Sequence, residues 1–161
     1  MENHTTTDPP TPAGKILAEL GIPFIEFKHD GPIRSIEQAA AERNQDVSQV
    51  VRSILFRCSE GEYFMVLVAG KGKISWQALR KHFERSRLTM ASPEEVLEVT
   101  GCEIGTVNPF GLPDGVPLLV DESVQAQPAV SMGSGVHGTA IMLTNQHLFE
   151  ALGPHVIGKF T

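Results

Sequence analysis

The sequence predicts a mixed α+β domain in which helices and strands alternate irregularly along 161 residues. The apolar segments 50–56 and 63–70 are separated by a short polar link, which is typical of a β-hairpin. Other predicted strands are joined by hairpins as well as by helices, so we expect a mainly antiparallel sheet rather than a doubly wound one. No internal repeat or linker is visible, and residues 13–161 are therefore predicted to form one domain.

The first half of the chain contains clear start and stop signals. Residues 1–12 hold three prolines and a threonine-rich run, and are expected to form a mobile tail. Apolar residues at helical spacing predict a helix from Gly14, and Gly21 marks its expected end. Alternating polarity predicts a strand over 23–27. Ser35, followed three residues later by a glutamine, fits a capping box that opens a second helix.

Capping signals also place the later elements. Ser75 is the expected N-cap of a helix that ends at Phe83, and Ser92 precedes a proline and two glutamates, which suit the first turn of a helix. Residues 101–117 are rich in glycine and proline and lack any period, so a long structured loop is expected. The remaining predicted elements are a strand at 116–121, a strand–turn–strand unit at 128–143, a helix at 146–152 and a short edge strand at 155–160.

Composition excludes several classes of protein. Hydrophobic residues make up 41% and charged residues 20% of the chain, which is incompatible with disorder of the whole chain. No apolar run approaches the roughly 18 residues of a membrane span, so no membrane partner is expected. The polar N-terminus lacks a signal-peptide pattern, and the two cysteines form no CxxC pair. We therefore expect a cytoplasmic protein.

Charge is distributed unevenly along the chain. The formal net charge is −6, yet six basic residues stand between residues 71 and 87 with a single acid among them. A local basic patch can bind a polyanion in an acidic protein, because salt screens each charge within about 10 Å. The alternative is a solvated helix face that only keeps the protein soluble, and the sequence leaves both interpretations open.

Familiar catalytic motifs are missing from the sequence. The histidines show no H-x-x-x-H or HExxH spacing, so neither a metal nor another cofactor is expected. There is no GxSxG nucleophile elbow and no GxxxxGK[ST] phosphate loop. A hydrolase with a catalytic serine triad and a P-loop nucleotidase are therefore both unsupported.

Three features are unusual enough to mark a candidate site. Arg52 lies inside an apolar strand, so it is expected either near solvent at the start of the strand, or in an ion pair, or in a site that expects an anion. The segment 105–113, GTVNPFGLP, and the segment 131–138, SMGSGVHG, combine glycines with rigid or polar residues. Glycine allows backbone N–H groups to approach a ligand closely, although a tight crossover loop and a simple hairpin turn explain the same segments.

The order of these segments resembles the YbaK/prolyl-tRNA-editing domain family over about residues 13–152. The most specific part is the GxVNPFGLP loop followed by the SMGSGVHG turn. The resemblance implies a mixed α/β fold with a curved, mainly antiparallel sheet and flanking helices. It also implies hydrolysis, without a metal, of the ester between a wrong amino acid and the 3′ adenosine of a tRNA. The chain resembles the free-standing members, whose partners would be the tRNA acceptor end and prolyl-tRNA synthetase.

The resemblance also implies site residues. Arg52 matches the family's usual lysine, and it can replace that lysine as a phosphate anchor but not as a neutral proton carrier. The other implied catalytic positions are Gly133, Ser134 and Gly135. The implied substrate-binding positions are His29, Gly105, Val107, Asn108, Pro109, Phe110, Gly111, Leu112, Ser131 and His137. The basic residues expected to contact tRNA are Lys71, Lys73, Arg80, Lys81 and Arg85.

Three functions remain open at this point. The first is a trans-acting deacylase of mischarged tRNA, with tRNA for proline carrying alanine or cysteine as the implied substrate. The second is a catalytically silent module that binds tRNA or a synthetase. The third keeps the ester-hydrolysing pocket but gives it a small free substrate. The sequence does not determine the oligomeric state.

Overall fold

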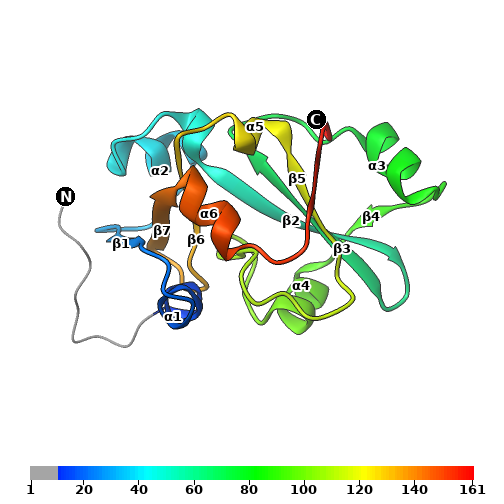
Figure 1. The fold of residues 1–161 in the computed structure, drawn as a ribbon, viewed down its shortest axis with the longest axis horizontal. Helices are drawn as coiled ribbons and strands as arrows, with labels where there is room; N and C mark the ends of the chain where they lie inside the picture. Colours follow the sequence, from blue (N-terminus) through cyan, green and yellow to red (C-terminus); the bar gives the residue numbers. More distant parts are fainter. Residues whose placement is uncertain (1–10) are drawn as a thin grey trace.

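The computed structural model describes residues 11–161, and the strands in this part of the chain form two sheets (Figure 1). The smaller sheet has the order β1-β7-β6 and is antiparallel throughout. The larger sheet has the order β4-β2-β3-β5-β8, in which β5 runs parallel to both of its neighbours. The strands are β1 (Ile25–Lys28), β2 (Val51–Ser59), β3 (Glu62–Ala69), β4 (Thr89–Met90), β5 (Leu118–Asp121), β6 (Ala129–Gly133), β7 (Thr139–Thr144) and β8 (Val156–Gly158).

The predicted α+β class is therefore confirmed, and the strands divide between two sheets where one curved sheet was expected. The two sheets approach each other at a single parallel bridge between Val50 and Ser131. The predicted hairpin is also confirmed, since β2 pairs antiparallel with β3 and places Arg52 opposite Val68. The bridge brings the start of β2 beside β6, which positions the site described below.

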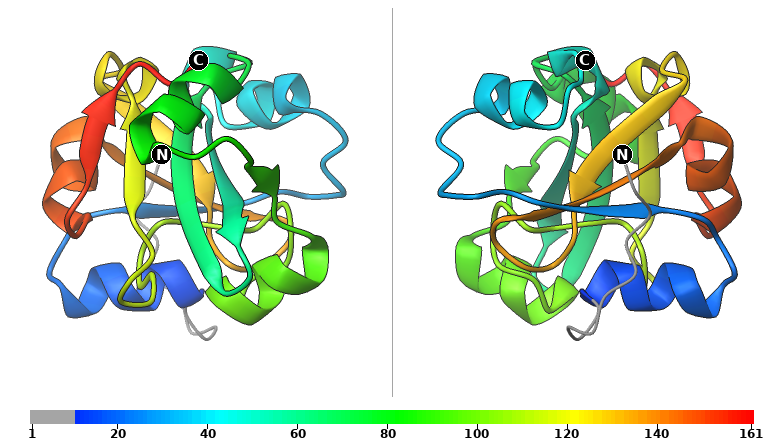
Figure 2. Two further views of the ribbon diagram at one scale, coloured as in Figure 1. Left: turned by 90° about the vertical axis from the view of Figure 1, so that its right-hand side faces the viewer. Right: turned by 90° about the vertical axis from the view of Figure 1, so that its left-hand side faces the viewer.

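The helices lie around the sheets: α1 and α4 along the lower edge of the molecule, and α2, α3 and α5 along the upper edge (Figures 1 and 2). A short 3-10 turn, η1, precedes β2. The bounds are α1 (Pro12–Glu19), α2 (Ile36–Glu42), η1 (Val47–Gln49), α3 (Trp76–Phe83), α4 (Pro93–Thr100), α5 (Glu122–Gln125) and α6 (Asn145–Ala151).

The start of α1 corrects one predicted boundary. The helix begins at Pro12, and the buried side chain of Thr11 caps it by accepting a hydrogen bond from the backbone N–H of Gly14. Proline suits this first helical position, so Thr11 and Pro12 are part of the fold although the sequence placed them in a tail. The rest of that predicted tail, residues 1–10, lies outside the described residues.

Serine caps the next predicted helices, but one capping box is only half formed. Ser35, Ser75 and Ser92 each accept a hydrogen bond from a backbone N–H in the first turn of α2, α3 and α4. Glu95 completes the box at α4 by accepting from the N–H of Ser92. In α2 the side chain of Gln38 does not return to Ser35, because it binds the loop before the helix and Glu42 instead.

Hydrophobic clusters cover both faces of the larger sheet. On one face, residues of β2 and β3 such as Leu55 and Leu67 pack against the smaller sheet, α1 and α6. On the other face, Phe56 and Phe64 stack with ring centroids 5.1 Å apart beneath Leu79 of α3. Because β3 is buried on both faces, it forms the centre of the core.

Residues near the C-terminus hold the loop that follows β3. The fully buried carboxylate of Asp121 accepts hydrogen bonds from the backbone N–H of Phe160, at 2.7 Å, and from the hydroxyl of Thr161. The carbonyl oxygen of Phe160 in turn accepts from the N–H of Ser75, at 2.7 Å. A β-carbon at Gly72 would stand 3.3 Å from the Thr161 side chain, so the chain end and this loop pack directly together.

Candidate active site

A cavity of about 670 Å³ lies where the start of β2, the end of β6, the glycine turn after β6, and α2 come together. Its lining includes Arg52 from β2, Gly133 from β6, and Gly105 and Val107 from the long loop. His29 and the first residues of α2 close the opposite side. The structure thus brings part of each of the three unusual sequence segments into one cavity.

The two glycine-rich segments touch each other directly. The backbone N–H of Gly135 donates a hydrogen bond to the carbonyl oxygen of Thr106 at 2.9 Å. A β-carbon at Gly133 would stand 2.5 Å from that same oxygen, a distance that no side chain tolerates. Gly135 has a φ of +96°, which disfavours any other residue. These glycines let the turn and the loop pack backbone to backbone, and so they shape the cavity wall.

Arg52 is held by backbone carbonyls and not by an acid. Its Nε donates to the carbonyl oxygen of Gly70 at 2.9 Å, and its Nη2 donates to that of Gly72. Burial lowers the pKa of Arg52, because the charged form loses part of its hydration. Among the described residues no carboxylate forms an ion pair with Arg52. The residue is half-buried at the cavity, where solvent or a ligand anion can balance its charge.

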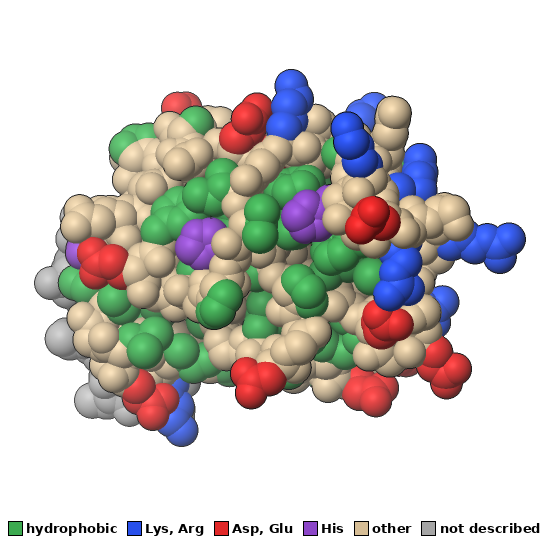
Figure 3. All heavy atoms as spheres, turned by 45° about the vertical axis from the view of Figure 1, so that its right-hand side comes forward, with side chains coloured by type: hydrophobic (Ala, Val, Ile, Leu, Met, Phe, Trp, Pro, Cys, Tyr) green, Lys and Arg blue, Asp and Glu red, His purple; other side chains and the backbone are tan. Residues whose placement is uncertain are grey.

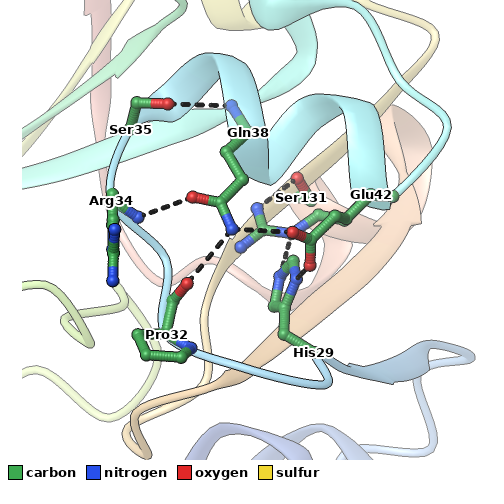
Figure 4. Close-up of polar contacts among 8 residues, drawn as sticks. His29, Pro32, Arg34, Ser35, Gln38, Glu42 and Ser131 are labelled. Atoms are coloured by element: carbon green, nitrogen blue, oxygen red, sulfur yellow. Dashed lines mark hydrogen bonds and ion pairs between the residues drawn. The ribbon is translucent and has the colours of Figure 1, made fainter.

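A polar network around His29, Gln38 and Glu42 lies beside α2 (Figure 4). Two of its members, His29 and Arg43, line the cavity. The Nδ1 atom of His29 lies 2.6 Å from a carboxylate oxygen of Glu42, and Gln38 donates to the other oxygen at 2.8 Å. Arg43 donates from Nε to His29 Nε2 at 3.1 Å and from Nη1 to the hydroxyl of Ser131 at 3.0 Å. Since Nε2 accepts from Arg43, the proton of the neutral imidazole is on Nδ1 and faces Glu42.

This network shifts the pKa of two of its members. The hydrogen bond from His29 is the main cause of the lowered pKa of Glu42, and the bond from Gln38 adds to it. Burial lowers the pKa of Arg43 to about 10, and the charge of Glu42 opposes this change. Arg43 still carries its charge at neutral pH. Both ring nitrogens of His29 are engaged, so His29 is not available as a proton acceptor in this arrangement.

Backbone N–H groups supply further donors near the cavity. The N–H groups of His137 and Gly138, two lining residues, make no hydrogen bond to another described residue. The exposed ring of His137 lies 3.6 Å from Glu103 at its Nε2 atom. No Asp or Glu within residues 11–161 lines the cavity. The site therefore combines cations and N–H donors, an arrangement that suits a ligand carrying negative charge or a polarised carbonyl.

The site residues predicted from the sequence divide into two groups. Those that line the cavity are His29, Arg52, Gly105, Val107, Gly133 and His137. Those that do not are Ser131, Ser134, Gly135, Asn108, Pro109, Phe110, Gly111 and Leu112.

The second group has structural roles. The buried hydroxyl of Ser134 bonds to the carbonyl oxygens of Val136 and Thr139, both at 3.1 Å, so it stabilises the turn. The side-chain oxygen of Asn108 accepts from the N–H of Phe110 at 3.0 Å, and the Phe110 ring is buried in the core. Pro109, Gly111 and Leu112 line a different hollow of about 490 Å³. The hydroxyl of Ser131 accepts a hydrogen bond from Arg43 and so supports a lining residue.

The predicted basic patch is partly neutralised. Lys71 pairs with Glu37 from α2, and Arg85 pairs with Glu62 at 2.8 Å. Lys73, Arg80 and Lys81 form no ion pair with any described residue. Figure 3 shows Lys and Arg side chains gathered at one end of the molecule. The loop that carries Lys71 and Lys73 is the same loop whose carbonyls hold Arg52, which connects this surface to the cavity.

Two negative findings concern the described residues. Within residues 11–161, no three His, Cys, Asp or Glu side chains are grouped so that they could hold a metal ion. No helix in that part of the chain is long and apolar enough to cross a membrane.

Comparison with known proteins agrees with the geometry. A family model described as the aminoacyl-tRNA editing domain matches residues 30–151. YwhH of Bacillus subtilis (strain 168), an uncharacterised protein, is 35% identical over 116 residues, which cover 72% of this chain and 73% of YwhH. A proline–tRNA ligase of Kosmotoga olearia is 34% identical over 101 residues, which cover 63% of this chain but only 17% of the ligase.

Solved structures show the same fold. A hypothetical protein, APE2540, aligns with a TM-score of 0.80 and 23% identity over 91% of this chain and 96% of its own. A candidate trans-editing enzyme for prolyl-tRNA synthetase aligns with a TM-score of 0.77 and 26% identity over 86% of each chain. The resemblance seen in the sequence is confirmed by these matches. The chain belongs to the aminoacyl-tRNA editing domain family.

Proposed function

We propose that this protein is a trans-acting deacylase, which hydrolyses the ester between a wrong amino acid and the 3′ adenosine of a tRNA. The observation that carries the proposal is the composition of the cavity. Its lining contains two guanidinium groups and a glycine turn whose N–H groups at His137 and Gly138 bond to no described residue. No carboxylate is among the described lining residues. Such a cavity favours a ligand that carries a phosphate and an ester carbonyl. Membership of the editing domain family supports the same reaction.

Arg52 is the proposed anchor for the phosphate of the terminal nucleotide. Two of its five N–H groups hold the carbonyls of Gly70 and Gly72, and the other three remain for a ligand. The two bonds fix the plane of the guanidinium group before a ligand arrives, which reduces the entropy lost on binding. Because an arginine stays protonated at working pH, Arg52 acts as a cation and not as a proton carrier.

The backbone donors and the substrate itself complete the proposed mechanism. The N–H groups of His137 and Gly138 stabilise the oxyanion that develops at the ester carbonyl, a contribution worth about 10²–10³ in rate per donor. The oxygen of a water molecule bonds to the ester carbon, and the bond from that carbon to the ribose oxygen breaks. One proton of the water passes to the leaving ribose oxygen, with the neighbouring ribose hydroxyl as the proposed relay. The protein contributes mainly positioning.

The tRNA for proline is the first candidate substrate, because the chain is similar to part of several proline–tRNA ligases. Alanine and cysteine are the amino acids that the family resemblance implies. Prolyl-tRNA synthetase is a second candidate partner on the same ground, since a free-standing editing protein would act on the product of that enzyme.

The test is a release assay with tRNA for proline charged with alanine or cysteine. We expect the wild-type protein to release the amino acid, Arg52→Ala to lose most of this turnover without a lower melting temperature, and Arg52→Lys to keep a substantial part. Arg57→Ala is the matched control, because Arg57 lies on the same strand but pairs with Glu95 outside the cavity.

Two results would contradict the proposal. Tight binding of charged tRNA with no release would indicate a catalytically silent module. Equal turnover of small amino-acid esters and of charged tRNA would indicate a free substrate, since the phosphate anchor would then have no effect.

A further inference from the structure

A second cation, the half-buried Arg43, lines the cavity and has no assigned role. It follows the last residue of α2, and its guanidinium group extends to β6, where Nη1 donates to the hydroxyl of Ser131. Two of its five N–H groups are used, by His29 and Ser131, which leaves three without a partner among the described residues.

The charge of Arg43 is only partly balanced, by the nearby charge of Glu42. His29 is the neutral tautomer and accepts only one hydrogen bond from Arg43, while Glu42 lies on the far side of the His29 ring. Among the described residues no carboxylate pairs directly with Arg43. The C-terminal end of α2 offers a partial negative charge only. A desolvated guanidinium group with free N–H donors favours an oxygen acceptor from a ligand.

Arg43 and Arg52 are bound to different parts of the cavity wall. The partners of Arg43 are deeply buried: Ser131 is 0% exposed and the side chain of His29 is 1% exposed. Arg52 is bound instead to the loop that carries the exposed Lys71 and Lys73. A ligand with its phosphate at Arg52 would have its aminoacyl group in the remaining part of the cavity, which Arg43 lines.

We propose that Arg43 determines the amino acid that is removed, and that it favours aminoacyl groups whose side chain carries an oxygen acceptor, most of all a carboxylate. The lining also includes the apolar residues Ile36, Ala39 and Met132. The other guanidinium group of the cavity belongs to Arg52, which the proposed function assigns to the phosphate. This inference rests on the proposed deacylase function. It departs from alanine and cysteine, because neither side chain has an oxygen atom that Arg43 could bind.

The experiment uses one tRNA charged in turn with four amino acids that form two pairs of equal shape. Threonine and valine differ by a hydroxyl in place of a methyl group, and aspartate and asparagine differ by a charge. Single-turnover rates of release are measured for each. We expect the wild-type protein to prefer threonine over valine and aspartate over asparagine, each by about tenfold or more, as is typical of a hydrogen bond to a charged group.

Variants then locate the source of the preference. We expect Arg43→Met to bring both ratios close to one, and Arg43→Lys to retain part of the preference for aspartate over asparagine. Arg34→Met is the matched control, because Arg34 is exposed beside the same helix and does not line the cavity. It should keep both wild-type ratios.

The possible failures are distinct. Wild-type threonine-to-valine and aspartate-to-asparagine rate ratios near one would overturn the inference. This result does not depend on whether Arg43→Met folds, because it is measured on the wild-type protein alone. Equal slowing of all four substrates by Arg43→Met, with unchanged ratios, would overturn it in favour of a structural role. No release from any charged tRNA, including those with alanine and cysteine, would instead contradict the proposed deacylase function, and this inference with it.

Discussion

Gly133 and Thr106 are in such close contact that a β-carbon on residue 133 would stand 2.5 Å from the Thr106 carbonyl oxygen. This contact joins the end of β6 to the long loop, and both segments contribute residues to the lining of the cavity. It explains why a glycine is needed at a position where the backbone itself is unstrained.

We therefore expect Gly133→Ala to destabilise the protein by about 1–3 kcal/mol, the usual cost of forcing an extra methyl group into packed structure. Activity should fall further than stability, because the loop must move away from the turn. Chemical unfolding and deacylation rates measure the two effects. Gly153→Ala is the control, since a β-carbon there meets nothing within 4 Å. Unchanged stability of Gly133→Ala would show that the contact is dispensable.

The hydrogen bonds of Glu42 predict a specific pH dependence. Because the folded state holds the pKa of Glu42 below its ordinary value of 4.5, the carboxylate contributes stability at pH values above 4.5. That contribution is lost as the pH falls through the lower, folded-state pKa. We expect Glu42→Gln to be less stable than wild type at pH 7 and to approach it at pH 3, as measured by urea unfolding. A difference between Glu42→Gln and wild type that stays constant with pH would contradict the assignment.

The basic surface predicts a salt dependence of tRNA binding. Lys73, Arg80 and Lys81 have no ion-pair partner among the described residues, so they are the candidates for phosphate contacts. Each lost contact should reduce the slope of log affinity against log salt by about 0.7–0.9. The triple glutamine variant is compared with Lys15→Gln on α1, which should leave the slope unchanged. Equal slopes for the triple variant and wild type would show that these three residues do not contact tRNA phosphates and only form a solvated surface.

Deacylation should continue in the presence of a metal chelator. The proposed mechanism assigns every step to the substrate, a water molecule and the donors of the cavity, and none to a metal. The rate is measured with pre-folded charged tRNA, so that magnesium needed for tRNA folding does not affect the result. Turnover that disappears in chelator and returns with added zinc would refute the mechanism.

Most of the fold could be predicted from local signals. The hairpin of β2 and β3 follows from two apolar runs, and the starts of α3 and α4 follow from serine caps. The short β4 and α5 escaped prediction because two or four residues are too few to show a period.

The site was less accessible to sequence reasoning. Arg43 was missed because its partner Ser131 is 88 residues away, and an arginine after a helix is no signal on its own. Residues 108–112 were expected to line the pocket, since they share a rigid motif with Gly105 and Val107. Asn108 and Phe110 are buried, and Pro109, Gly111 and Leu112 line a different hollow, so only the beginning of that motif lines the cavity. Both the role of Arg43 and the position of residues 108–112 depend on contacts between residues far apart in the sequence, which local patterns do not reveal.

The attachment of Phe160 to Asp121 has a practical consequence for protein production. The same C-terminal residues pack against Gly72 and Ser75, and the Gly72 carbonyl is one of the two that orient Arg52. An affinity tag fused directly after Thr161 would strain the hydrogen bonds between Phe160, Thr161 and Asp121. The Gly72 carbonyl would then shift and change the orientation of Arg52, although the tag does not touch the cavity. Purification tags are better placed ahead of Thr11, and a fluorescent label after Thr161 would report on the loop that holds Arg52.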